Sequence, residues 1–232
     1  MKTQSALINN KRTYGFSSEV ELLNFIEDKK NILIALNAEK LMNDNTELND
    51  IINTNIGYPD GIGAVFALKK KGIKSKKIAG ADLWLHIVNE FQDSKSFYLI
   101  GGKPNIIQNT VSKLKTEFPK IKLLGYRDGF LKKGDEEKLV QDLLEKKPDV
   151  VFVAMGSPKQ ELLMKSFIQE HKALYMGLGG SFDVYTGLKK RAPEIYQKLG
   201  LEWLHRLFIE PTRWRRQLVY FTFLFKLVFN KI

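Results

Sequence analysis

Apolar runs of β-strand length recur along the chain, and each is followed by a turn signal and a segment of helical character. The runs occupy residues 31–37, 96–102, 121–126, 149–156 and 173–180. Because they are apolar almost throughout, both faces of each strand are expected to be buried, as in a parallel sheet covered by helices. The pattern predicts an α/β fold, Rossmann-like, with a mostly parallel sheet flanked by helices.

The segments between these runs carry helix start signals. Ser18 followed by Glu21 is a capping-box pattern, and Pro104 and Pro158 lie where a first helical turn is expected. Residues 134–147 place their acidic side chains first and their lysines last, as the helix dipole favours. These signals indicate an ordinary α/β scaffold.

The 232 residues, 44% of them hydrophobic, suffice for one α/β domain with an appendage. We expect a core domain over residues 1–195 and a helical, membrane-associating appendage over residues 196–232. The chain has no cysteine, which excludes disulfides, thiolate zinc sites and a cysteine nucleophile. Residues 1–15 contain no apolar stretch of signal-peptide length, so a cytoplasmic protein is expected.

The end of the chain is first basic and then apolar. Residues 189–232 contain ten Lys or Arg and three Glu, so seven of the eleven net positive charges lie there. Residues 200–216 predict a helix that is followed, from Pro211 onward, by a second helix that the proline starts or kinks. Residues 218–229 contain ten apolar side chains, but twelve helical residues span about 18 Å against a hydrocarbon core of about 30 Å. This segment therefore either lies in the membrane interface or packs on a partner subunit.

In parallel α/β sheets, ligands bind beyond the carboxyl ends of the strands, so the loops after the apolar runs are candidate sites. Gly101 and Gly102 precede a helix start and can offer backbone N–H groups to a phosphate, although glycines that only turn the chain are the alternative. Neither a complete dinucleotide fingerprint nor a Walker A pattern is present.

Two polar residues in these loops have chemistry of their own. Asp60 lies between Pro59 and Gly61 at the expected mouth of the sheet, where a carboxylate can act as a base. A turn or a helix cap is the alternative reading of Asp60. Gln160 begins a helix just after a buried strand, and its amide forms hydrogen bonds without a useful pKa, which indicates substrate positioning.

Several reaction classes lack their motifs. The three histidines show no metal-ligand spacing, and no D-x-D triplet is present, so no metal site is predicted. The absence of a G-x-S-x-G elbow disfavours the corresponding hydrolases.

Motif blocks extend over nearly the whole chain. They are "LNAEKL" (36–41), "PDGIG" (59–63), "AGADL" (79–83), "YLIGGKP" (98–104), "MGSPKQE" (155–161), "GLGGSFDVYTG" (177–187), "KRAPE" (190–194) and "GLEWLHRLFIEPTR" (200–213). With these blocks the chain resembles the TagA/WecG/CpsF family of bacterial glycosyltransferases. The last three blocks, in that order, are the most specific.

The resemblance implies transfer of an N-acetylhexosamine-type sugar, typically N-acetylmannosamine or its uronic acid, from a UDP donor to a GlcNAc-diphospho-polyprenol acceptor. It implies inversion at the anomeric carbon without a metal or another cofactor. The product would serve cell-surface polysaccharide or teichoic acid synthesis. The protein would associate peripherally with the anionic inner face of the cell membrane.

Roles carry over to matching positions. The resemblance makes Asp60 the catalytic base, Gln160 a residue of the substrate site, and Asn37 and Asp183 residues of the nucleotide-sugar pocket. The basic positions of an appendage that completes the active site at the membrane are Arg206, Arg213 and Arg216.

The chain departs from the family pattern at Ala35, where Thr is frequent, and at residues 125–130, "GYRDGF", where the family has an aromatic-rich loop. Both departures concern contacts to the donor sugar. An alternative function is a non-catalytic nucleotide- or nucleic-acid-binding module, motivated by a pI of about 9.6. No nucleic-acid-binding motif supports it, so nucleic acid is not an expected partner. The sequence does not determine the oligomeric state, and a homo-oligomer is one of the states that it allows.

Overall fold

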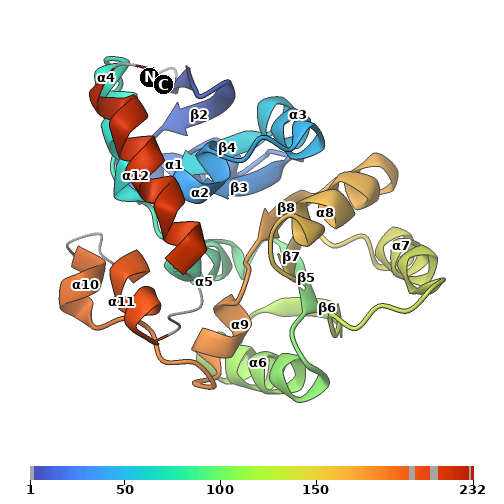
Figure 1. Cartoon of the computed structure of the whole chain (residues 1–232). Coiled ribbons are helices and arrows are strands. Elements are labelled where there is room, and N and C mark those ends of the chain that lie inside the picture. The colour runs from blue at the N-terminus through green and yellow to red at the C-terminus, as the bar shows by residue number, and fades with distance from the viewer. Residues whose placement is uncertain (1–2, 199–201, 210–213, 230) are drawn as a thin grey trace. The chain divides into compact units, whose positions relative to one another are not determined.

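The computed structural model describes residues 3–198, 202–209, 214–229 and 231–232, without the side chains of Lys198, Arg206 and residues 214–217. The fold is α/β, with helices flanking a mostly parallel six-stranded sheet in the order β4-β3-β8-β7-β5-β6 (Figure 1). Its strands are β3 (Ile32–Leu36), β4 (Ile56–Pro59), β5 (Ser96–Gly101), β6 (Lys122–Arg127), β7 (Val150–Ala154) and β8 (Leu174–Gly177).

The α/β class is confirmed, and so are the predicted strands, since each of the five apolar runs overlaps one strand of this sheet. The expected burial of both faces does not hold for the edge strand β6, in which no residue is buried. Two features were not predicted. One is β4, and the other is an antiparallel hairpin of β1 (Gln4–Ile8) and β2 (Lys11–Gly15), whose turn residues Asn9 and Asn10 have φ of 47° and 63°. The chain divides into two compact units, which are described in turn.

One unit comprises residues 20–34 and 80–189. Its helices are α1 (Glu19–Ile26), α5 (Gly80–Phe91), α6 (Pro104–Glu117), α7 (Asp135–Lys146), α8 (Lys159–Glu170) and α9 (Ser181–Tyr185). Its core is aromatic: the ring of Trp84 meets the rings of Phe152 and Phe182 edge to face, with centroid distances of 5.7 and 5.6 Å. The predicted helix starts hold, because Pro104 is the first residue of α6 and Pro158 directly precedes α8.

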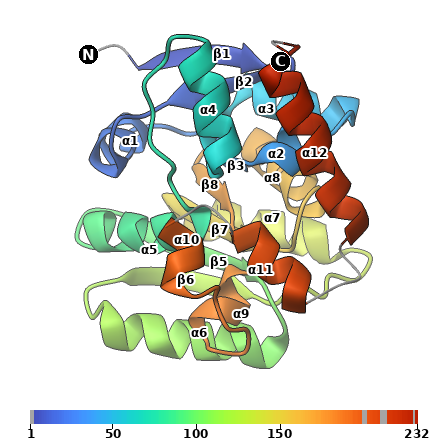
Figure 2. The ribbon, with the colours of Figure 1, turned by 60° about the vertical axis from the view of Figure 1, so that its left-hand side comes forward.

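The other unit comprises residues 3–19, 35–79 and the described residues from 190 onward. Its helices are α2 (Ala38–Leu41), α3 (Thr46–Thr54), α4 (Ile62–Lys70), α10 (Glu194–Lys198), α11 (Glu202–Ile209) and α12 (Trp214–Val228). Helix α12 packs against α2 and α4, and Figure 2 shows it beside α4. This unit therefore combines the N-terminal hairpin with the basic and apolar end of the chain.

The two helices predicted near the end of the chain are present as α11 and α12, while Pro211 lies outside the described residues. Across the described ranges, no helix combines the length and the apolar character that crossing a bilayer requires. The domain boundary between residues 195 and 196 stays a prediction.

Candidate functional site

Asn37 and Asp60 follow β3 and β4 and lie next to each other in one unit. The backbone N–H of Asp60 donates to the carbonyl of Leu36 at 3.0 Å. A Cβ atom placed on Gly61 would lie 3.5 Å from the Cβ of Asn37. The two strand ends therefore bring together two polar residues that are 23 positions apart in the sequence.

Asn37 and Asp60 differ in their relation to the helices that follow them. Asn37 is the N-cap of α2, and its side-chain oxygen accepts a hydrogen bond from Lys40 N at 2.9 Å. Asp60 is half-buried, and Gly61, rather than Asp60, occupies the N-cap position of α4. The structure thus places the Asp60 carboxylate in the connection between β4 and α4.

Tyr58 is a residue beside this pair that sequence reasoning missed. Its side chain is fully buried in β4, and residues i and i+2 of a strand share a face, as Tyr58 and Asp60 would if the strand continued. Burial, followed by the charges of Asp60 and Glu19, raises the pKa of the Tyr58 hydroxyl well above its usual value. Within the described residues this hydroxyl has no hydrogen-bond partner. The Asp60 charge therefore acts on a buried hydroxyl two positions before it in the sequence.

Gly101 and Gly102 end β5 in the other unit, where the backbone of β7 comes very close. Gly101 has φ of 125°, and a Cβ atom there would lie 2.2 Å from the carbonyl oxygen of Ala154. The N–H of Gly102 donates to that same oxygen at 3.2 Å, and its carbonyl accepts from Gly129 N at 2.9 Å. The Gly102 N–H is thus engaged by the fold, and a role of this loop in ligand binding stays a prediction.

Gln160 is buried in the first turn of α8, with its side chain 3% exposed. Its Oε1 accepts from the backbone N–H of Gly179 at 2.9 Å, and its Nε2 donates to Glu161 Oε1 at 3.1 Å. A Cβ atom on Gly177 would lie 2.3 Å from Gln160 Nε2. Both ends of the amide therefore act within the protein, and Gln160 holds the glycine-rich loop that follows β8.

Asp183 lies on α9, at the far side of this loop. Its carboxylate, with the side chain 23% exposed, pairs with Lys189 Nζ at 3.1 Å. Ser181, the first residue of α9, donates its hydroxyl to Leu178 O at 2.7 Å. Ser181 and Glu161 were not predicted as site residues, although both belong to the motif blocks "GLGGSFDVYTG" and "MGSPKQE". The described structure thus gathers Gln160, Gly179 and Asp183 around the β8–α9 connection.

The predicted basic positions cannot be placed in the same way. Arg213 and the side chains of Arg206 and Arg216 lie outside the described residues. Their predicted roles stay predictions, since of Arg206 and Arg216 only the backbone, in α11 and α12, is described.

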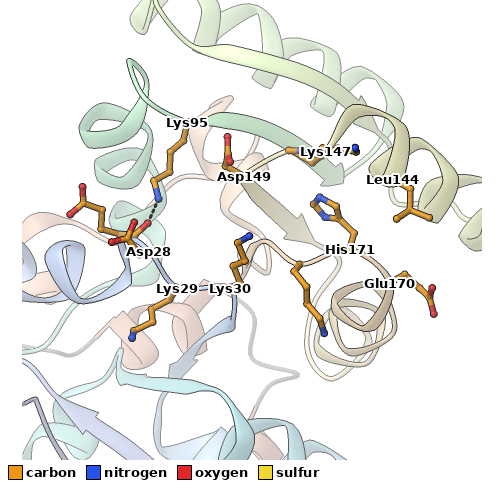
Figure 3. Close-up of a pocket in the computed structure, with 12 residues that line it drawn as sticks. Asp28, Lys29, Lys30, Lys95, Leu144, Lys147, Asp149, Glu170 and His171 are labelled. Atoms are coloured by element: carbon orange, nitrogen blue, oxygen red, sulfur yellow. Dashed lines mark hydrogen bonds between the residues drawn. The ribbon is translucent and has the colours of Figure 1, made fainter.

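A charged cavity of about 490 Å³ lies at the opposite, amino ends of β5, β7 and β8 (Figure 3). Figure 3 shows Lys30, Asp149 and His171 on its walls, and none of the predicted site residues lines it. Burial alone would raise the pKa of Asp149, but hydrogen bonds from Ser96 outweigh it and hold this pKa below its usual value. Burial lowers the pKa of His171. Most lysines of the cavity follow the C-terminal ends of helices, where the helix dipole favours positive charge, and acidic side chains lie among them. The charges of the cavity are therefore explained by the fold, without a ligand.

The described ranges contain no group of three or more His, Cys, Asp or Glu side chains that could hold a metal ion. A metal-independent mechanism stays a prediction.

A comparison with known families supplies the remaining evidence. The protein-family model described as "Glycosyl transferase WecG/TagA/CpsF family" matches residues 15–232 of the chain. The match includes both groups of site residues described above, and only the first strand and most of the second lie before it.

Proposed function

Because the chain belongs to the WecG/TagA/CpsF family of glycosyl transferases, we propose that it moves an N-acetylhexosamine, N-acetylmannosamine or its uronic acid, from UDP to a GlcNAc-diphospho-polyprenol. The family match over residues 15–232 is the observation that carries this proposal. The product would be an intermediate of cell-surface polysaccharide or teichoic acid synthesis.

Asp60 is the proposed general base. In an inverting transfer, one base takes the proton of the acceptor hydroxyl while the hydroxyl oxygen bonds to the anomeric carbon of the donor. The bond from that carbon to the UDP oxygen breaks, and UDP leaves with the electron pair. The half-buried position of Asp60 between β4 and α4, next to Asn37, supports this role.

The departing UDP develops negative charge, which the protein must stabilise. Backbone N–H groups at helix N-termini provide such stabilisation without a metal. The β8–α9 connection offers a glycine-rich loop before α9, and Gln160 holds this loop by its hydrogen bond from Gly179. Asn37 and Asp183 would contact the nucleotide sugar. Arg206, Arg213 and Arg216 would bind the diphosphate of the acceptor.

The acceptor is a lipid, so the enzyme is proposed to work at the inner face of the membrane. Helix α12 supports this part of the proposal, because large apolar side chains are exposed along it. They include Leu218, Phe221, Leu224, Phe225 and Val228, each at least 52% exposed. A helix with such a face and a basic start can lie in the interface of anionic lipids.

The test is a donor screen. Purified protein is incubated with UDP-N-acetylmannosamine, its uronic acid or other UDP-hexosamines, together with a GlcNAc-diphospho-lipid in detergent. Mass spectrometry should detect a lipid-linked disaccharide with one of these donors. Absence of product with every donor, in detergent and in liposomes, would contradict the proposed function.

A further inference from the structure

An apolar groove separates α4 from the C-terminal end of α12, within one unit of the chain. It encloses about 520 Å³ and is lined by Phe66, Lys69, Lys70, Leu227 and Val228. Phe66 is 51% exposed and Val228 is 60% exposed, so the groove opens to the surface. Its volume falls in the range of small-molecule sites.

Helices α4 and α12, which form the walls of the groove, contact each other at two places along their length. A Cβ atom on Gly63 would lie 2.8 Å from Phe223 Cε1, so the glycine allows the buried Phe223 ring to approach α4 closely. Further along, Lys70 Nζ donates to the carbonyls of Leu227 and Val228 at the end of α12. These contacts define a groove built by both helices.

The apolar surface continues from the groove along α12, where Phe221, Leu224 and Phe225 are each at least 55% exposed. Contiguous exposed apolar patches of this kind mark interaction sites. The groove is thus one end of a larger apolar surface.

The rim of the groove is basic. Residues 61–81 contain six lysines and no acidic residue, and Lys69, Lys71 and Lys74 are exposed. Apolar walls beside ammonium groups match a hydrocarbon chain that ends in a phosphate. A second copy of this chain fits less well, because a symmetric contact would bring two such lysine clusters together.

Helix α4 also connects the groove with Asp60. The helix starts at Ile62, directly after Asp60 and Gly61. Residues 66–70 lie about 6 to 12 Å further along at 1.5 Å per residue. A lipid-linked sugar carries its diphosphate between the reacting sugar and the hydrocarbon chain. The chain of such an acceptor would therefore begin where the groove lies.

We propose that the α4–α12 groove holds the first part of the hydrocarbon chain of the acceptor. This inference rests on the proposed function, since it assigns one part of the acceptor to one part of the chain. It gives α4 two roles, with the base at its start and the lipid near its end.

The kinetic test compares two GlcNAc-diphosphate acceptors, one with a long polyprenyl chain and one with a short, water-soluble alkyl chain, both in detergent. Phe66→Ala should lower kcat/KM for the long-chain acceptor about tenfold more than for the short-chain acceptor, because apolar contact area is lost only with the long chain. Val20→Ala is the control, since this exposed apolar residue of α1 lines neither the groove nor the apolar surface of α12. Its effect on the two acceptors should differ by less than about threefold.

Equal losses with both acceptors after Phe66→Ala, or an equal chain-length effect in Val20→Ala, would overturn the groove assignment. A second experiment does not depend on turnover. A GlcNAc-diphospho-polyprenol with a diazirine near the diphosphate should label residues 62–70 or 227–228 of the wild-type protein, mapped by mass spectrometry. Labelling elsewhere with intact turnover would reject the groove and leave the proposed function standing. Labelling of the groove without turnover would support the groove assignment and contradict the proposed function.

Discussion

The side-chain oxygen of Gln160 accepts a hydrogen bond from the backbone N–H of Gly179 at 2.9 Å. This bond joins the first turn of α8 to the loop after β8, and the Gln160 amide nitrogen donates in turn to Glu161. Gln160 therefore fixes the conformation of a glycine-rich loop. Any effect of Gln160 on a substrate would be indirect, through the position of this loop.

Gln160→Met keeps the side-chain length but removes both hydrogen bonds. It should lower the free energy of unfolding by about 1 to 3 kcal/mol, because Gly179 N and Glu161 Oε1 lose partners in a buried place. Turnover should fall as well. Urea denaturation and steady-state kinetics measure the two effects. Gln169→Met, at an exposed position of α8, is the control and should change neither quantity.

Asp60→Asn tests the proposed base. The amide cannot accept the acceptor proton, so kcat should fall about a hundredfold or more. UDP binding, measured by calorimetry, should stay within about twofold of wild type, since a change of twofold is only about 0.4 kcal/mol. Asp50→Asn, on the exposed surface of α3, controls for the loss of one charge. Near-normal turnover of the Asp60 variant would remove this residue from the base role.

Gly101→Ala tests the close approach of the backbones of β5 and β7. With φ of 125° and a carbonyl oxygen 2.2 Å from the new Cβ, the alanine cannot fit without moving Ala154. The free energy of unfolding should fall by about 2 kcal/mol or more. Gly180→Ala is the matched control, because φ is −98° and no atom lies within 4 Å of its Cβ position. Thermal melts of both variants decide the question, and equal melting temperatures would contradict the prediction.

Asp149 links stability to pH. Hydrogen bonds from Ser96 N and Oγ hold its pKa below the ordinary value of 3.8 although burial opposes this. The carboxylate therefore stabilises the fold above pH 3.8, and this contribution is lost as pH falls through the lower folded-state pKa. Asp149→Asn should lower the free energy of unfolding by about 1 kcal/mol at neutral pH, a value reduced for partial exposure. The difference from wild type should shrink in denaturation curves at acidic pH, and a constant difference would exclude the linkage.

Removing residues 213–232 deletes α12 and the apolar surface beside α4. Binding to anionic liposomes, measured by sedimentation, should be lost, together with turnover of the lipid-linked acceptor. Circular dichroism checks that the rest remains folded, since the deletion also uncovers the α4 face that packs on Phe223. Full turnover of the truncated protein on a short-chain acceptor would mean that the segment serves only as an anchor.

The sequence by itself determined the α/β class and the strands of the sheet that lie in long apolar runs. Burial on both faces requires near-continuous apolar residues, and β7, for example, is buried at every position. The four residues of β4 and the alternating pattern of β2 have no such run, so they were missed. The helix starts could also be predicted from the sequence, because a proline or a run of acidic residues exerts its effect within one helical turn.

The sequence motifs also singled out Asp60, Gln160 and the glycines as candidate residues, and the family resemblance added Asn37. Tertiary structure alone decided what surrounds them. Gln160 and Gly179 are 19 residues apart, and their hydrogen bond exists because β7 and β8 are neighbours in the sheet. The groove of Phe66 and Val228 joins positions more than 160 residues apart. Local sequence specifies which elements form, whereas long-range packing brings their side chains together, and contacts between distant residues leave no periodic signal in either segment.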